Sequence, residues 1–212
     1  MKKAVLTWCF FWGILLLAAG QPAGLATTEP ETLFQGDVSH SFYFAPSLML
    51  TRWQDRSGFM VGGKVAWVLN QKFGLGLAGY GLTTRNNIGE VLQYANNVFL
   101  QVGYGGALLE YTPNPSRLLH FSFPLIIGVG GAAYTNSPLG NNTSNRYSYE
   151  VYQTDTFFVM EPGVQAELNM ARFMRLGLAA SYRFAQGVDL SRSSDRDMSA
   201  PTVSLTFKFG KF

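Results

Sequence analysis

The sequence predicts an all-β fold, an eight-stranded antiparallel up-and-down transmembrane β-barrel, that follows an N-terminal signal peptide. The clearest observation is the stretch from Phe157 to Phe184, where apolar residues occupy every second position in two runs separated by Met170–Arg172. A period of two indicates β-strands rather than helix. Strands of soluble proteins average five or six residues, whereas runs of about ten or more suit a bilayer. We therefore expect a long membrane-spanning β-hairpin here.

Composition and charge support a membrane barrel of a single domain. Charged residues make up 14% of the chain and aromatic residues 15%, against roughly 25% charged in typical soluble domains. Without Lys2 and Lys3, 14 of the 16 basic residues remain against 13 acidic ones, so the chain is almost neutral. The sequence has no basic patch of the kind that nucleic acid requires. We expect no nucleic-acid partner.

Residues 1–26 have the pattern of an export signal. A positive start, Met1-Lys2-Lys3, precedes the apolar run Ala4–Ala19, and Gly24-Leu25-Ala26 offers a cleavage site, with Ala18-Ala19-Gly20 as the alternative. An uncleaved anchor is the competing interpretation, but the run is shorter than the ~20 residues that a span needs. Cys9, the only cysteine, lies in this segment. We expect residues 27–37 to form a short N-terminal extension and residues 38–212 to form the barrel.

The same alternation recurs along the rest of the chain. Together with the two strands of the 157–184 hairpin, the predicted strands are Ser41–Trp53, Phe59–Leu69, Phe73–Thr84, Val98–Tyr111, Leu118–Tyr134 and Ala200–Phe209. In the strand Val98–Tyr111 the apolar phase slips by one residue near Gly105-Gly106, which predicts a glycine bulge.

The connections between these strands alternate in length. Three are short: Asn70–Lys72, Thr112–Arg117 and Met170–Arg172. Three are long and polar, namely Arg85–Asn97, Thr135–Thr156 and Ala185–Ser199, and Gln54–Gly58 is a modest loop. Short turns at one end and long loops at the other are typical of barrels in an outer membrane, where the long loops face outward.

The apolar face of every strand is expected to face lipid, because an eight-stranded barrel has room inside only for packed side chains. The opposite face then supplies an inward charge network that consists of Lys64, Glu110, His120, Glu161, Glu167, Arg175, Arg183 and Lys208. With Met170–Arg172 as a three-residue turn, Glu167 pairs across the hairpin with Arg175, and Glu161 with Ser181. The near balance of signs favours paired charges over a selectivity ring.

Aromatic residues are predicted to form two girdles at the membrane interfaces. Near the short turns these are Trp67, Phe73, Tyr111, Phe121, Phe173, Phe207 and Phe209. Near the long loops they are Trp53, Phe59, Phe157, Phe158, Tyr182 and Phe184.

The export signal, the alternating strands and the end of the chain, Val203–Phe212, resemble the small outer-membrane β-barrel proteins of the OmpA/OmpX type. This resemblance implies an outer-membrane location in a Gram-negative cell, contact with outer-membrane lipid and a monomeric barrel. It also implies that the C-terminal strand is read by the barrel-assembly machinery. Phe212 is out of phase with Phe207 and Phe209, so which of them serves as the terminal aromatic stays open.

Few residues suggest chemistry. His120-Phe121-Ser122 resembles the His-x-Ser motif of outer-membrane lipid A deacylases, but the topology places it near the short turns and facing inward, which favours a structural histidine. Asp195-Arg196-Asp197 is better explained as a charged loop than as a calcium site. We expect no cofactor, no metal and no catalytic residue. Tyr147, Tyr149 and Tyr152 form a tyrosine-rich loop segment, either solvated or able to bind an unknown external ligand.

The predicted function is that of a non-enzymatic integral outer-membrane protein with a role in envelope structure or in interactions of its surface loops. A porin-like narrow channel or small-ligand conduit is the alternative, and a lipid-modifying enzyme is a remote one. A secreted lipocalin-like carrier would have the opposite polarity, apolar within and polar outside, and the charged inward face argues against it.

The alternation of connection lengths generates a prediction about orientation. Epitope tags placed in Arg85–Asn97 or Ala185–Ser199 should be accessible to antibody on intact cells, because only the long connections are expected outside. Tags placed in Asn70–Lys72 or Met170–Arg172 should become accessible only after permeabilisation. The reverse pattern of labelling would mean that the barrel is inserted the other way up.

Overall fold

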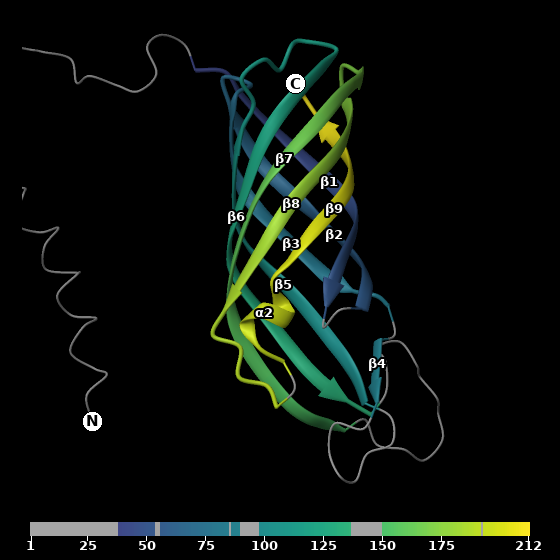
Figure 1. The fold of residues 1–212 in the computed structure, drawn as a ribbon. Coiled ribbons are helices and arrows are strands. Elements are labelled where there is room, and N and C mark those ends of the chain that lie inside the picture. Colours follow the sequence, from purple (N-terminus) through teal and green to yellow (C-terminus); the bar gives the residue numbers. More distant parts are fainter. Residues whose placement is uncertain (1–37, 54–55, 85, 90–97, 137–149, 192) are drawn as a thin grey trace, which may run out of the picture. The chain divides into compact units, whose positions relative to one another are not determined.

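The structure, a computed structural model, describes residues 38–53, 56–84, 86–89, 98–136, 150–191 and 193–212. The predicted signal peptide and the extension 27–37 lie outside the described residues, as do Tyr147 and Tyr149. The described residues form a closed barrel, shown in Figure 1.

The barrel consists of eight long antiparallel strands, together with one short extra strand and one short helix. The elements are β1 (His40–Trp53), β2 (Arg56–Leu69), β3 (Phe73–Leu82), β4 (Asn86–Gly89), β5 (Val98–Tyr111), β6 (Leu119–Thr135), β7 (Val151–Ala171), β8 (Met174–Gln186), α2 (Asp195–Met198) and β9 (Ala200–Gly210). The strand order is β3-β2-β1-β9-β8-β7-β6-β5, and pairing of β3 with β5 closes the sheet. The short β4 pairs with the start of β5. The predicted fold class and the eight predicted strands are confirmed.

The two ends of the barrel differ. We call one the turn end, formed by the connections at residues 70–72, 112–118 and 172–173, and the other the loop end, which carries residues 187–199 and α2. At the turn end, Asn70 and Gln71 have φ angles of 50° and 58°, and the Lys72 amide donates to the Leu69 carbonyl at 3.0 Å. Positive φ at both central residues is typical of the tight turns that suit twisted hairpins.

The loop end contains a connection shorter than expected. Trp53 pairs with Arg56, so β1 and β2 pair almost to the tip of their hairpin. The predicted five-residue loop Gln54–Gly58 was therefore too long, because strand pairing continues through residues that are polar or glycine. On the other side of the barrel, β7 begins at Val151 rather than at Phe157.

Side chains alternate between the inside and the outside of the barrel along every long strand. Large apolar side chains cover the outside, with exposed fractions that reach 68% for Phe42, 62% for Leu77 and 67% for Val129. A soluble surface rarely carries so continuous an apolar area, whereas hydrocarbon requires one. Among the described residues, no helix is long and apolar enough to cross a membrane.

The predicted bulge at Gly105-Gly106 is absent. Pairing of β5 with β3 and with β6 runs through both glycines without a shift in register. Leu100, Val102 and Tyr104 therefore point into the barrel and are at most 5% exposed. The one-residue shift of the apolar positions in this strand has another cause: the interior of the barrel is apolar near the loop end and polar near the turn end.

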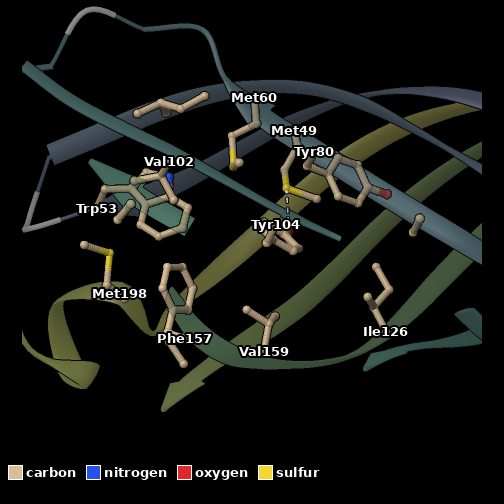
Figure 2. Packing of buried hydrophobic residues seen from close by; sticks show 14 of the residues in the cluster. Met49, Trp53, Met60, Tyr80, Val102, Tyr104, Ile126, Phe157, Val159 and Met198 are labelled. Atoms are coloured by element: carbon tan, nitrogen blue, oxygen red, sulfur yellow. Dashed lines mark hydrogen bonds between the residues drawn. The ribbon is translucent and has the colours of Figure 1, made fainter. Parts of the chain in front are cut away.

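The loop half of the interior is an apolar core, shown in Figure 2. Trp53 and Phe157 belong to this core, with exposed fractions of 0% and 3%, and Met198 of α2 packs beside them. Their assignment to an aromatic girdle was wrong. Both occupy odd positions of strands whose odd positions face inward, so the alternation placed them inside although their chemistry suggested an interface.

A pair of glycines allows close approach of two strands, and this generates a prediction. Gly106 of β5 pairs with Gly128 of β6, and a Cβ on Gly106 would lie 2.2 Å from the Ile127 carbonyl oxygen. Gly106→Ala should lower stability by about 1–3 kcal/mol, because the strands would have to separate. The measurement is urea unfolding of refolded protein in micelles, followed by tryptophan fluorescence.

Gly81→Ala is the matched control, since a Cβ at Gly81 meets nothing within 4 Å. Equal unfolding midpoints for the two variants would contradict the close approach of β5 and β6.

Candidate functional site

The eight charged or titratable residues predicted for the lumen all lie inside the barrel. Their exposed fractions range from 0 to 7%. We call them, with their polar neighbours, the interior polar network. The members predicted from sequence are Lys64, Glu110, His120, Glu161, Glu167, Arg175, Arg183 and Lys208. They come from six strands, so the network ties together most of the barrel wall.

Glu167 of β7 is the centre of this network. Its Oε1 accepts hydrogen bonds from Lys208 Nζ at 2.5 Å, from Ser122 Oγ at 2.6 Å and from Gln165 Nε2 at 2.7 Å. The carboxylate is fully buried, and three donors on one oxygen compensate for the loss of water. The predicted network did not include Ser122 and Gln165, although both were on the inward face of their strands.

The second oxygen of Glu167 has longer contacts. Oε2 lies 3.3 Å from His120 Nε2 and 3.7 Å from Arg175 Nη1. The other ring nitrogen of His120, Nδ1, lies 3.0 Å from the Arg117 carbonyl oxygen. His120 thus connects the network to the connection 112–118 at the turn end.

Lys208 of β9 bridges two carboxylates. Its Nζ lies 2.6 Å from Glu110 Oε1 as well as 2.5 Å from Glu167. Glu110 also accepts a hydrogen bond at 3.3 Å from the hydroxyl of Tyr43, whose ring centroid lies 4.8 Å from Lys208 Nζ. Lys64 donates to Gln165 Oε1 at 3.3 Å and completes the cluster. The ammonium group of Lys208 therefore connects β9 to both β5 and β7.

The register of the β7–β8 hairpin differs from the prediction. Asn169 pairs with Arg175 and Ala171 with Met174, with a register shift between Asn169 and Ala171, so Glu167 opposes Gly177. The shift has a physical reason: Asn169 Nδ2 donates to the carbonyls of residues 115 and 117, at 3.1 and 2.7 Å. The direct Glu167–Arg175 cross-strand pairing was wrong, yet the two side chains still meet because they share a face.

A second cluster surrounds Glu161, nearer the loop end. Glu161 accepts hydrogen bonds from the hydroxyls of Tyr104 and Ser181, the latter at 2.5 Å. Ser181 pairs with Gly163 rather than with Glu161, which corrects the predicted register by two residues. Glu161 and Ser181 are therefore diagonal neighbours rather than a direct pair, and their side chains still form the predicted contact.

Arg183 connects the barrel wall to α2. Its Nε donates to the Met198 carbonyl at 2.9 Å, its Nη2 donates to the Arg52 carbonyl at 3.0 Å, and its Cζ lies 3.5 Å from the ring centroid of Trp53. The fully buried guanidinium thus bonds to carbonyls and faces an aromatic ring rather than a carboxylate, and its Nη1 has no hydrogen-bond partner among the described residues. Nothing in the sequence indicated that Arg183 anchors the loop-end connection.

The connection between β8 and β9 folds over the loop end. Ser194 and Asp197 form a capping box at the start of α2, and the Ser199 hydroxyl accepts from the Ala185 amide at 2.9 Å. Tyr134 and Ser193 form a hydroxyl–hydroxyl hydrogen bond of 2.6 Å. The segment 195–197, expected as an exposed charged loop, is therefore a capped helical turn. Within the described part of the chain, no group of three or more His, Cys, Asp or Glu side chains could hold a metal ion.

His120 and Ser122 do not form a nucleophile–base pair. The hydroxyl of Ser122 donates to Glu167, and His120 also faces Glu167 rather than Ser122. Nucleophilic catalysis requires the hydroxyl to donate to the imidazole. The geometry therefore matches a structural network better than the acyl-transfer arrangement that the motif suggested.

All but one of the other predicted girdle residues lie on the outward faces of their strands, namely Phe59, Trp67, Phe73, Tyr111, Phe121, Phe158, Tyr182, Phe184, Phe207 and Phe209. The exception, Phe173, is exposed in the turn before β8. Several contact one another: Phe73 and Tyr111 lie 5.0 Å apart between ring centroids, and Tyr182 and Phe184 lie 4.7 Å apart. Their function at membrane interfaces stays a prediction.

A closed eight-stranded up-and-down barrel with an apolar outer face and a buried charge network defines the class of small outer-membrane β-barrel proteins. Among solved structures, the chain is similar to Neisserial surface protein A, with 12% identity, a TM-score of 0.54, and coverage of 84% of this chain and 100% of that one. It is also similar to the N-terminal barrel domain of Pseudomonas aeruginosa OprF (12% identity, 82% and 99% coverage, TM-score 0.46). A third is Yersinia pestis Ail bound to the heparin analogue sucrose octasulfate (10% identity, 81% and 97% coverage, TM-score 0.49). At these identities the likeness concerns the fold.

Searches by sequence add nothing to this likeness, since no family model and no curated protein matches the chain.

The geometry of the interior polar network generates a prediction about stability. Glu167→Gln and Lys208→Met should each lower the free energy of unfolding by about 3–5 kcal/mol, because each removes one partner of a buried ion pair and leaves the remaining charges unbalanced. The double variant should lose less than the sum of the two single losses. Urea unfolding of refolded protein in micelles measures all three.

Glu150→Gln serves as the control, because Glu150 is exposed outside the barrel. Additive losses in the double variant would show that Glu167 and Lys208 do not interact.

Proposed function

We propose that this chain is a non-enzymatic integral protein of the outer membrane that does not conduct solutes and acts through its loop-end surface. The single observation that carries this proposal is the closure of the loop half of the barrel. Met198 of α2 is fully buried and packs with Trp53 and Phe157. A solute path along the barrel axis would have to displace this apolar core.

The polar half of the interior supports the same conclusion. A conducting lumen needs polar side chains in contact with water, as in wide porins. Here, in contrast, Glu110 and Glu167 both bond to Lys208, and all three residues are at most 7% exposed. Their charges stabilise the barrel wall instead of lining a path for ions.

The loop end offers a surface for interaction. β6 and β7 contain 17 and 21 residues, against 14 in β1 and 10 in β3, and their pairing extends to Thr135 and Val151. Figure 1 shows β5, β6 and β7, with the short β4 beside β5, reaching beyond the other long strands at this end. The extended strands form a one-sided ledge. The connection 187–199 lies against this ledge: Asp189 donates its amide to Asp155 Oδ2 at 2.5 Å, and Ser191 bonds to Gln153. A ledge held by backbone pairing can present side chains to an external partner at low entropic cost.

The porin-like channel remains the alternative function, and conductance separates the two. Refolded protein added to a planar lipid bilayer should give no stable current steps, since the core around Trp53 blocks the axis. A variant lacking residues 188–198 is the matched control, because removal of Met198 and α2 takes away part of the plug.

Stable steps from the intact chain would contradict the proposal. A known porin refolded in parallel shows that the bilayer reports conductance.

A further inference from the structure

The turn end of the barrel contains a pocket of about 270 Å³. Its polar lining includes Gln71, Ser116, Asn169, Arg172 and Arg175, and the ring of Phe212 forms an apolar wall. The pocket lies at the opposite end of the barrel from the ledge, so it goes beyond the function proposed above.

Arg175 is the residue that gives this pocket its chemistry. The residue is 6% exposed, and its Cζ lies 4.0 Å from the ring centroid of Phe212. Its contacts within the barrel are long: Nη1 lies 3.7 Å from Glu167 Oε2, and Nη2 donates to the Pro115 carbonyl at 3.4 Å. Among the described residues, its Nε is buried and has no hydrogen-bond partner. A buried charged donor without a partner is costly unless a ligand supplies the acceptor.

The exposed charged side chains that the structure describes at the turn end are all basic. Lys72, Arg117, Arg172 and Lys211 are exposed at the turn end. In the described part of that end, the acids are Glu110 and Glu167, which are buried and bonded to Lys208. The exposed acids of the described chain, such as Asp189 and Asp195, lie at the loop end instead. A concave site lined by one sign of charge attracts counter-ions.

We propose that the turn-end pocket binds an oxyanion, a phosphate or carboxylate group, through Arg175 Nε–H with Arg172 as a second donor. Guanidinium groups match both anions in geometry, and such charge-assisted hydrogen bonds are among the strong ones. The side-chain amide of Asn169 already donates to two carbonyls, so it shapes the pocket rather than binding the anion.

The direct test is nuclear magnetic resonance of arginine Nε–H groups in refolded protein held in an uncharged maltoside detergent. On titration with inorganic phosphate, the Arg175 signal, assigned by its loss in Arg175→Lys, should shift and saturate. Arg172→Gln should weaken this binding about tenfold, the effect of losing one charge-assisted hydrogen bond. Arg196→Gln removes an exposed arginine at the loop end and should leave the affinity unchanged.

Two further titrations distinguish the sources of the anion. Acetate in place of phosphate reports carboxylate binding. In nanodiscs of phosphatidylglycerol, a lipid headgroup in the pocket would shift the Arg175 signal before phosphate is added, whereas a soluble anion would shift it only on titration. Either result supports the pocket.

The proposal is overturned if neither phosphate nor acetate gives a saturable shift of the Arg175 signal in maltoside. It is overturned equally if all arginine signals move together, or if Arg172→Gln leaves the affinity unchanged.

Discussion

The structure depends on one constraint: the interior of an eight-stranded barrel holds side chains and little else. Every charge placed inside must therefore find its partners on the barrel wall, because bulk water is not there to solvate it. Glu167 shows how this is met, with Lys208, Ser122 and Gln165 all donating to one of its oxygens. The donors come from β6, β7 and β9, so satisfaction of one carboxylate also holds three strands in register.

The same constraint explains why the interior changes character along the barrel. Near the turn end, short tight turns hold the strands in place, and charged side chains can reach across the lumen to one another. Near the loop end, the strands extend to different lengths, and apolar side chains such as Trp53, Phe157 and Val159 fill the interior. Arg183 is the charged side chain within this loop-end zone, and its guanidinium lies over the ring of Trp53 while donating to the carbonyl of Met198.

Alternation was enough to predict most of the fold and the inward position of all eight charged residues. The prediction failed only where a residue was assigned by its aromatic or apolar character instead of by its odd or even position in the strand. Trp53 and Phe157 were assigned to the membrane interface because they are aromatic, although their odd positions placed them inside. Leu100, Val102 and Tyr104 were assigned to the outside because they are apolar, and a bulge was inferred to restore the phase. When part of the interior of a membrane barrel is apolar, the polarity of a side chain no longer shows whether it faces inward or outward. The two-residue period still does, because it is set by backbone geometry.

Pairing register was beyond the reach of the sequence for a different reason. A shift of two residues keeps every side chain on its face, so hydrophobic pattern alone cannot distinguish the alternatives. In the β7–β8 hairpin the shift depends on Asn169, whose amide bonds to carbonyls of the neighbouring connection 112–118. That contact joins residues more than fifty positions apart. The contacts of Arg183 with Arg52 and Met198 are of the same kind: they arise when the sheet closes and leave no local pattern.

The two ends of the barrel are closed by different means, and this difference bears on function. At the loop end an apolar core and α2 fill the axis, and Arg183 finds carbonyl partners for two of its nitrogens. At the turn end Arg175 has only long contacts, and its Nε is left without a partner among the described residues. Each of these two arginines on the inward face of β8 thus keeps one buried nitrogen without a partner among the described residues, Nη1 in Arg183 and Nε in Arg175. Since a buried guanidinium is retained at a cost in stability unless it is bonded, Arg175, which lines the turn-end pocket, is placed where a ligand can supply the acceptor.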